Sequence, residues 1–159
     1  MVKDAFFEDG EDRPIRLMAV DGDDLQVVSS LVQDAVVTPG DLSWRSSERR
    51  FALLINRYRW EIHSASAQLA VPAQRVRTIL VFDDVIRVAT QGFDRTDQDL
   101  VLSLLSVSWT AAEDGGGEIL LTMAGFGAVL LTCECVNAVM QDVTSPYAAA
   151  SGRAPEHPQ

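Results

Sequence analysis

The sequence has few of the residues that build metal and nucleophilic sites. Its 159 residues include only two cysteines and two histidines. Zinc sites need such ligands in clusters, at spacings such as Cys-x-x-Cys or His-Glu-x-x-His, and neither spacing occurs. Cys133 and Cys135 fall on an expected strand, and we interpret them as buried, unpaired thiols. The sequence therefore predicts no metal and no cofactor, and its cysteine use fits a reducing cytoplasm.

Long apolar runs are also missing. No segment reaches the roughly 18 consecutive apolar residues of a membrane-spanning helix. The first residues, MVKDAFFEDGEDRP, lack the apolar stretch of a secretory signal. We therefore expect a cytoplasmic protein that has no membrane partner.

Positive charge is scarce and unevenly placed. The chain has 23 acidic and 13 basic residues, a formal charge of -10, so it should repel nucleic acid unless basic residues gather locally. Between Arg45 and Arg77 there are seven arginines and two glutamates, so this window carries +5 and the rest of the chain -15. Such polarity could direct an anionic partner to one side of the molecule.

Hydrophobic periodicity predicts one clear helix, over about 24–36. Leu25, Val28 and Val32 recur at spacings of three and four, which places them on one face. Asp21, Asp23 or Asp24 would cap its N-terminus. A short second helix is predicted over about 97–105, followed by a strand over about 106–112.

Most of the remaining chain alternates as antiparallel strands do. We expect strands at 14–20, 41–46 and 49–62, within 75–93, and in two runs after a glycine-rich turn at 113–118. The second of these runs, AVLLTCECVNAVMQDV, is expected to form one strand. The fold class is therefore α+β, mostly antiparallel sheet, with an acidic arm at 1–13, one domain at 14–147 and a flexible tail at 148–159.

The two halves of the domain contain similar short sequence segments in the same order. LSWRSSE (42–48) matches VSWTAAE (107–113), FALL (51–54) matches ILLT (119–122), and LVFDDVIRV (80–88) matches LTCECVNAV (131–139). Each match is short, so duplication and a chance echo both stay open. Duplication predicts two pseudo-symmetric units, at about 14–92 and 93–147, which bury their apolar faces together.

Several of these segments resemble a known family. The aspartate-rich helix entry followed by QDAV, then RRFALLINRYRWE, RVRTILVFDDV, DLVLSLLSVSW and the closing DVTSPY are similar to a family of small alphaproteobacterial proteins known only as a domain of unknown function. The resemblance runs from about Phe7 to His157. It implies a bacterial, cytoplasmic protein and adds no site residue.

The segment FALLINRYRWE (51–61) combines aromatic and basic residues. Its apolar residues occupy odd positions up to Ile55 and even positions from Tyr58, so a β-bulge or sharp bend is predicted near Asn56. Beyond that bend, Arg57 and Arg59 would share an exposed face while the aromatic side chains point the other way, which is unfavourable for base stacking beside phosphate contacts.

Three interpretations of the arginines are open. They pair with acids such as Glu61, Asp83 or Asp84, or they form a patch for a protein partner or self-association, or they bind RNA or another anionic ligand. The candidate binding residues are Arg49, Arg50, Arg57, Arg59, Arg75 and Arg77.

No catalytic residue can be assigned from the sequence. The serines lack a Gly-x-Ser-x-Gly setting, His63 stands alone in a loop, and Asp83 and Asp84 would point to opposite faces of a strand. The favoured function is a non-catalytic interaction module that uses the arginine-bearing strands. RNA binding is the alternative, and a small enzyme with a pocket between the two halves is the third.

Overall fold

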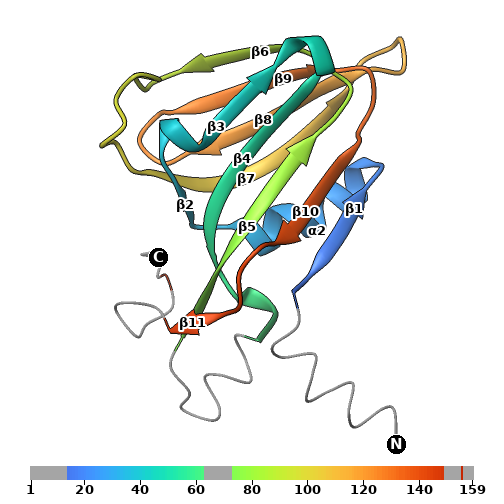
Figure 1. Ribbon diagram of the computed structural model, residues 1–159. Coiled ribbons are helices and arrows are strands. Elements are labelled where there is room, and N and C mark those ends of the chain that lie inside the picture. Colours follow the sequence, from blue (N-terminus) through green and yellow to red (C-terminus); the bar gives the residue numbers. More distant parts are fainter. Residues whose placement is uncertain (1–13, 63–72, 149–154, 156–159) are drawn as a thin grey trace, which may run out of the picture.

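The computed structural model describes residues 14–62, 73–148 and 155, and it has the expected α+β fold dominated by antiparallel strands (Figure 1). One α-helix, α2 (Gly22–Val32), accompanies an eleven-stranded sheet. The strands are β1 (Arg16–Ala19), β2 (Ala35–Val37), β3 (Leu42–Arg45), β4 (Arg50–Tyr58), β5 (Gln74–Phe82), β6 (Val85–Gln91), β7 (Leu102–Ala111), β8 (Gly117–Met123), β9 (Ala128–Cys133), β10 (Ala138–Asp142) and β11 (Tyr147–Ala148).

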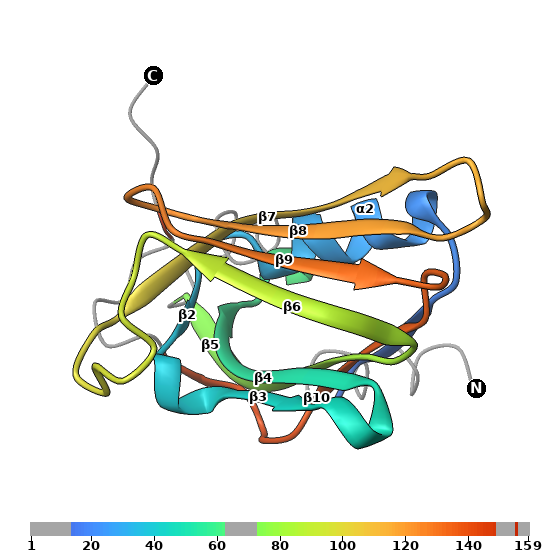
Figure 2. The same ribbon diagram turned by 90° about the horizontal axis from the view of Figure 1, so that it is seen from above.

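The sheet folds into two layers that face each other across the core (Figure 2). One layer contains β3, β4, β5 and β10 side by side, with β1 beyond β10, and the other contains β7, β8, β9 and β6. Each layer is thus three consecutive strands plus one strand from the other half of the chain. In the two hairpins Trp44 lies opposite Phe51 and Trp109 opposite Ile119.

The chain passes between the layers at two adjacent places. β5 continues into β6 through Asp83 and Asp84, and β9 continues into β10 through 134–137. These two crossings run antiparallel to each other, with Phe82 opposite Ala138 on one side of the corner and Val85 opposite Cys133 on the other. The single strand expected over 128–143 is therefore wrong, because the chain turns there from one layer to the other.

The helix α2 begins after Asp21, one of its predicted capping residues. Asp21 accepts a hydrogen bond from the Asp24 amide, and the Asp24 carboxylate accepts one from the Val20 amide, so each side chain satisfies a free amide at the helix start. Its buried face packs on β7 and β1. The helix ends at Val32, earlier than expected, because residues 35–37 form β2, a strand between β4 and β7.

The predicted second helix over 97–105 is wrong. Asp94 and Asp97 accept hydrogen bonds from the amides of Thr96 and Asp99, which stabilises successive turns instead of a helix. From Leu102 the chain is already in β7, where Leu102 and Leu104 both point into the core. The leucine spacing thus marks alternate positions of a strand.

The predicted bulge near Asn56 is also wrong. β4 and β5 pair in unbroken register from Phe51 opposite Phe82 to Tyr58 opposite Arg75. The inward positions of β4 continue past Ile55 to Arg57, which is 0 % exposed. A charged residue therefore occupies the next core position.

The core lies between the layers and under α2. Its largest fully buried apolar side chains include Leu25, Leu53, Ile55, Leu80, Phe82, Leu104, Ile119, Leu121 and Leu131. Trp109 packs against Gly117 and Gly22, so it connects the β7–β8 hairpin to the start of α2. Across the described ranges, no helix is both long and apolar enough to cross a membrane.

Candidate functional site

The six predicted binding arginines occupy three different environments. Arg57 and Arg59 are buried at one end of the sheet, Arg49 and Arg50 lie at the corner where the chain changes layers, and Arg75 and Arg77 lie on the outer face of β5. The structure therefore does not bring them together into one patch.

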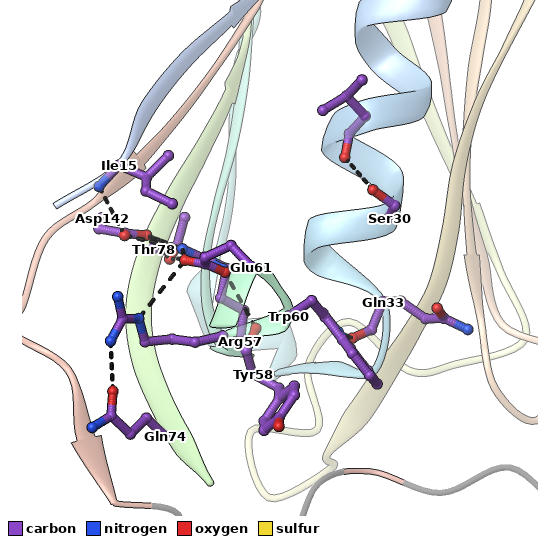
Figure 3. A network of polar contacts seen from close by, with 12 residues as sticks. Ile15, Ser30, Gln33, Arg57, Tyr58, Trp60, Glu61, Gln74, Thr78 and Asp142 are labelled. Atoms are coloured by element: carbon purple, nitrogen blue, oxygen red, sulfur yellow. Dashed lines mark hydrogen bonds and ion pairs between the residues drawn. The ribbon is translucent and has the colours of Figure 1, made fainter. Parts of the chain in front are cut away.

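Arg57 is enclosed by two carboxylates (Figure 3). Its Nη1 and Nη2 atoms donate to the two oxygens of Glu61 at 2.8 and 2.9 Å, and its Nε and Nη2 atoms donate to the two oxygens of Asp142 at 3.1 and 3.0 Å. Paired hydrogen bonds of this kind match the planar guanidinium to each carboxylate. Sequence reasoning named Glu61 as a partner and did not single out Asp142 among the acids of the other half of the chain, 85 residues away.

Asp142 joins Arg57 to β5 and to the residue that precedes β1. Its carboxylate also accepts hydrogen bonds from the Thr78 hydroxyl at 2.7 Å and from the Ile15 amide at 3.0 Å. Burial opposes the charge on Arg57, but its hydrogen bonds and attraction to Glu61 and Asp142 outweigh burial and raise its pKa. A permanently charged, fully paired Arg57 therefore holds the fold together and offers no free group to a ligand.

Arg59 and its aromatic neighbours form the other half of this buried end. Arg59 is 2 % exposed, and its Nη1 donates to the side-chain oxygen of Gln74. Tyr58 and Trp60 meet edge to face with ring centroids 4.6 Å apart, and the Trp60 indole donates to the carbonyl oxygen of Gln33 just after α2. The expectation that Arg57 and Arg59 are exposed is wrong, because paired acids and amides accommodate them inside.

Arg49 and Arg50 lie on the surface and are paired. Arg49 forms an ion pair with Glu134, and Arg50 donates from Nε to Asp83 at 2.8 Å, which raises the Arg50 pKa. Both pairs join the β3–β4 hairpin to the corner segments. Solvent screens exposed pairs of this kind, so they add little to stability.

The two cysteines flank the same corner and differ in environment. Burial raises the pKa of the Cys133 thiol to about 12. Cys135 is exposed, contrary to expectation, and partial burial and the hydrogen bond from its thiol to Asp84 raise its pKa as well. The Asp84 carboxylate also accepts a bond from Asn137, and these two bonds lower its pKa. Neither thiol therefore has the lowered pKa that is typical of a reactive cysteine.

Clusters that could hold a metal ion are absent from the described part of the chain. His63 and His157 lie outside the described residues, as do the predicted arm at 1–13 and most of the tail at 148–159.

Arg75 and Arg77 lie on the outer face of β5. Arg77 is exposed, and Arg75 donates to the backbone and side-chain oxygens of Asn56. On the same outer face lie Arg16 of β1 and Tyr147 of β11, and the Tyr147 hydroxyl bonds to Asn56 at 2.6 Å. We call Arg16, Arg75, Arg77 and Tyr147 the arginine face.

Ion pairs at the arginine face are few in the part of the chain that the structure describes. Within the described residues, neither Arg16 nor Arg77 forms an ion pair. The strands of Arg16 and Arg77 both pair with β10, which lies between them. Arg16 lies opposite Gln141, and Gln141 lies opposite Ile79, two residues from Arg77. The nearest acid on β10, Asp142, points inward to Arg57. Sequence reasoning missed Arg16 and Tyr147, because only strand pairing places them beside β5.

Comparison with known proteins gives a family and no relative of known function. No curated protein matches the chain, and no solved structure matches it. A family described as "Protein of unknown function (DUF2948)" matches residues 15–157, which span β1 to beyond β11. The chain therefore belongs to this family of unknown function.

Proposed function

We propose that this protein is a non-catalytic interaction module whose arginine face binds an acidic surface of a protein partner. The observation that carries this proposal is the presence of two guanidinium groups, on Arg16 and Arg77, without ion-pair partners in the described residues of a chain with a net charge of -10. Guanidinium groups match carboxylates in a planar, two-bond geometry, which suits recognition of Asp and Glu side chains.

Three of the other arginines are already engaged within the protein. Arg49, Arg50 and Arg57 already form ion pairs inside the protein, so a partner would have to compete with those acids. Between the arginines, the outer face carries apolar or uncharged side chains, including Leu54, Ile79 and Gln141. A surface of separated cations on an uncharged background favours a specific acidic partner.

RNA or another anionic ligand is the second candidate. Tyr147, 40 % exposed, pairs in register with Arg75, so an aromatic ring and a cation share one surface after all. Base stacking on an aromatic ring beside phosphate contacts is the usual mode of single-strand binding. The third interpretation, an enzyme pocket between the halves, is less favoured. The space between the layers is filled by the apolar core, and a depression of about 240 Å³ between the start of α2 and β7 has a single ionisable lining residue, Asp23, among the described residues.

The test reverses charge on the arginine face without touching buried groups. Affinity purification with the wild type, with Arg16→Glu plus Arg77→Glu, and with Arg87→Glu plus Arg95→Glu compares two equal changes of charge on different surfaces. We expect one protein to be retained by the wild type and by the Arg87/Arg95 control, and reduced at least about tenfold by the Arg16/Arg77 variant.

Recovery of the same proteins by all three forms would overturn the proposal. A gel-shift titration with single-stranded RNA distinguishes RNA binding from binding of an acidic protein. RNA binding requires an affinity that falls steeply with salt and is lost in the Arg16/Arg77 variant. Sedimentation of the purified protein tests whether the partner is a second copy.

We also propose that the two halves arose by duplication and that the protein works in the bacterial cytoplasm. The corresponding orders β3-β4-β5-β10 and β7-β8-β9-β6, each closed by a strand from the other half, support the duplication, as do the equivalent positions of Trp44 and Trp109. The lack of a helix matching α2 before β7 is the main departure from symmetry. This relation is tested by superposing residues 14–92 on residues 93–147, which should place Trp44 on Trp109.

A further inference from the structure

We propose a second docking surface, on the outer side of the β7–β8–β9–β6 layer, which binds an extended basic segment of another protein. The segment adds as a strand to the free edge of β6 and places its apolar side chains beside the exposed ring of Phe126. This surface lies on the other layer from the arginine face and does not depend on the function proposed for that face (Figure 2).

An apolar groove of about 560 Å³ crosses the outer face of this layer. Strand pairing sets Leu120 opposite Leu130 and Leu130 opposite Ala89, so a row of apolar side chains leads across the sheet to β6. None of the described residues that line the groove is ionisable. In a strongly acidic chain, a charge-free surface depression is a feature typical of a binding site.

Phe126 is the most unusual residue on this surface. Its side chain is 94 % exposed at the tip of the β8–β9 turn. Its backbone has a φ of +73°, a left-handed conformation that is costly for a residue with a large side chain. The ring therefore contributes nearly no burial to the fold, while its backbone conformation costs stability, and such outliers are found at functional sites.

The turn that carries Phe126 is firmly supported. Gly92, just after β6, approaches so closely that a Cβ atom there would lie 2.2 Å from the Phe126 carbonyl oxygen. The next residue in the turn, Gly127, packs against the side chains of Met123 and Phe93. The backbone that presents the ring is thus fixed before a partner arrives, which lowers the entropy cost of binding.

β6 provides the backbone groups that an extended partner needs. It pairs with β9 on one side and ends the order of strands in the described sheet. Its first residues lie near the turn at Ser46–Glu48, whereas Ala89, Thr90 and Gln91 line the groove. An unprotected edge next to an apolar groove is the arrangement used for strand addition, in which main-chain hydrogen bonds give affinity and side-chain pockets give specificity.

The surrounding charge selects a basic partner. The loop that follows β6 carries three exposed aspartates, Asp94, Asp97 and Asp99, against one arginine, Arg95. On the outer face of the layer, Arg87 of β6 and Glu118 of β8 lie on either side of Thr132 and carry opposite charges. Asp94 and Asp97 bond within the loop to Thr96 and Asp99, and these bonds leave their negative charge uncompensated. Lysine or arginine residues at the end of an added strand would lie next to this loop.

The test measures fluorescence anisotropy of a labelled peptide of alternating valine and threonine with paired lysines at both ends. We expect saturable binding to the wild type and at least about a tenfold loss with Phe126→Asn, since removal of a central aromatic anchor has this size of effect. Asparagine tolerates a positive φ, so this variant should keep or raise the melting temperature, and lost binding cannot be ascribed to unfolding. Met18→Asn, which removes an exposed apolar side chain from the other layer, should bind as the wild type does.

Two control peptides test the mode of binding. One has glutamates in place of the lysines, and the other has prolines in place of the threonines, which removes main-chain donors. Equal binding of the glutamate peptide would overturn the charge preference, and equal binding of the proline peptide would overturn strand addition. Unchanged binding to Phe126→Asn would overturn the site itself.

A second copy of this chain is the competing occupant. Dimers seen by sedimentation of the wild type and lost in Phe126→Asn would overturn the proposal in favour of self-association. The Arg16→Glu plus Arg77→Glu variant should bind the lysine peptide with unchanged affinity, so failure of this proposal and failure of the arginine-face proposal can be told apart.

Discussion

At the scale of single residues, Arg57 shows how a buried charge can organise a fold. Two carboxylates and a hydroxyl from separate elements converge on it, and the described residues contain no buried side-chain nitrogen or oxygen without a hydrogen-bond partner. A buried charge is tolerated when its partners are complete, and removal of one partner leaves an isolated ion inside the protein.

Replacing Arg57 with leucine should destabilise the protein by about 3–5 kcal/mol, because Asp142 and Glu61 lose their shared cation and Asp142 stays buried. Urea unfolding measures this change. The double variant Arg57→Leu with Asp142→Asn should recover part of the loss, because the uncompensated buried carboxylate is removed. A double variant as unstable as the sum of the two single variants would contradict a direct coupling.

Glu61 predicts a pH dependence with a definite sign. Partial burial of Glu61 opposes its charge, but hydrogen bonds and attraction from Arg57 outweigh burial and lower the Glu61 pKa below its usual value of about 4.3. A carboxylate with a lowered pKa in the folded state stabilises the protein above its unfolded pKa, and this stability is lost as pH falls through the folded pKa.

We therefore expect Glu61→Gln to lower stability by about 1–3 kcal/mol near pH 7. The difference from the wild type should shrink below about pH 4. Thermal unfolding of both proteins across this range checks the expectation. A difference that stays constant to acid pH would show that the charge of Glu61 is not what stabilises the fold.

At the scale of elements, short connections decide where the strands lie. The turn at Asp83–Asp84 and the segment 134–137 carry β5 and β9 from one layer to the other, and Asp84 adopts a φ of +60° to do so. The β8–β9 turn also depends on one particular residue elsewhere in the chain, because only glycine at position 92 fits against the backbone of Phe126. These close approaches depend on residues far apart in the chain.

Two substitutions at the β8–β9 turn should change stability in opposite directions. Gly92→Ala should destabilise the protein by at least about 1 kcal/mol, because its φ of +79° disfavours a side chain and the new Cβ meets the Phe126 carbonyl. Phe126→Asn should be neutral or stabilising by up to about 1 kcal/mol, because asparagine adopts a positive φ more readily. Chemical denaturation of both variants tests the pair, and a destabilised Phe126→Asn would show that the ring supports the fold.

At the scale of the whole molecule, two surfaces of different chemistry lie on the two layers. The outer face of one layer carries Arg16, Arg75 and Arg77, while the other carries an uncharged groove beside an aspartate-rich loop. A molecule with such surfaces could hold two different protein segments at once. The excess of negative charge in the sequence does not describe the arginine face, since strand pairing and burial determine where the charges lie.

The sequence by itself determined the fold class, the capped helix and most of the strands, because helix caps, turns and alternating burial are local properties of neighbouring residues. It also predicted that Tyr58 and Trp60 belong to the packed interior, where the structure places them together. Only the tertiary structure decided that Arg57 and Arg59 are buried, because their partners Asp142 and Gln74 come from other strands. The same holds for the arginine face and the groove at Phe126, since strand order and the approach of distant segments determine which side chains share a surface.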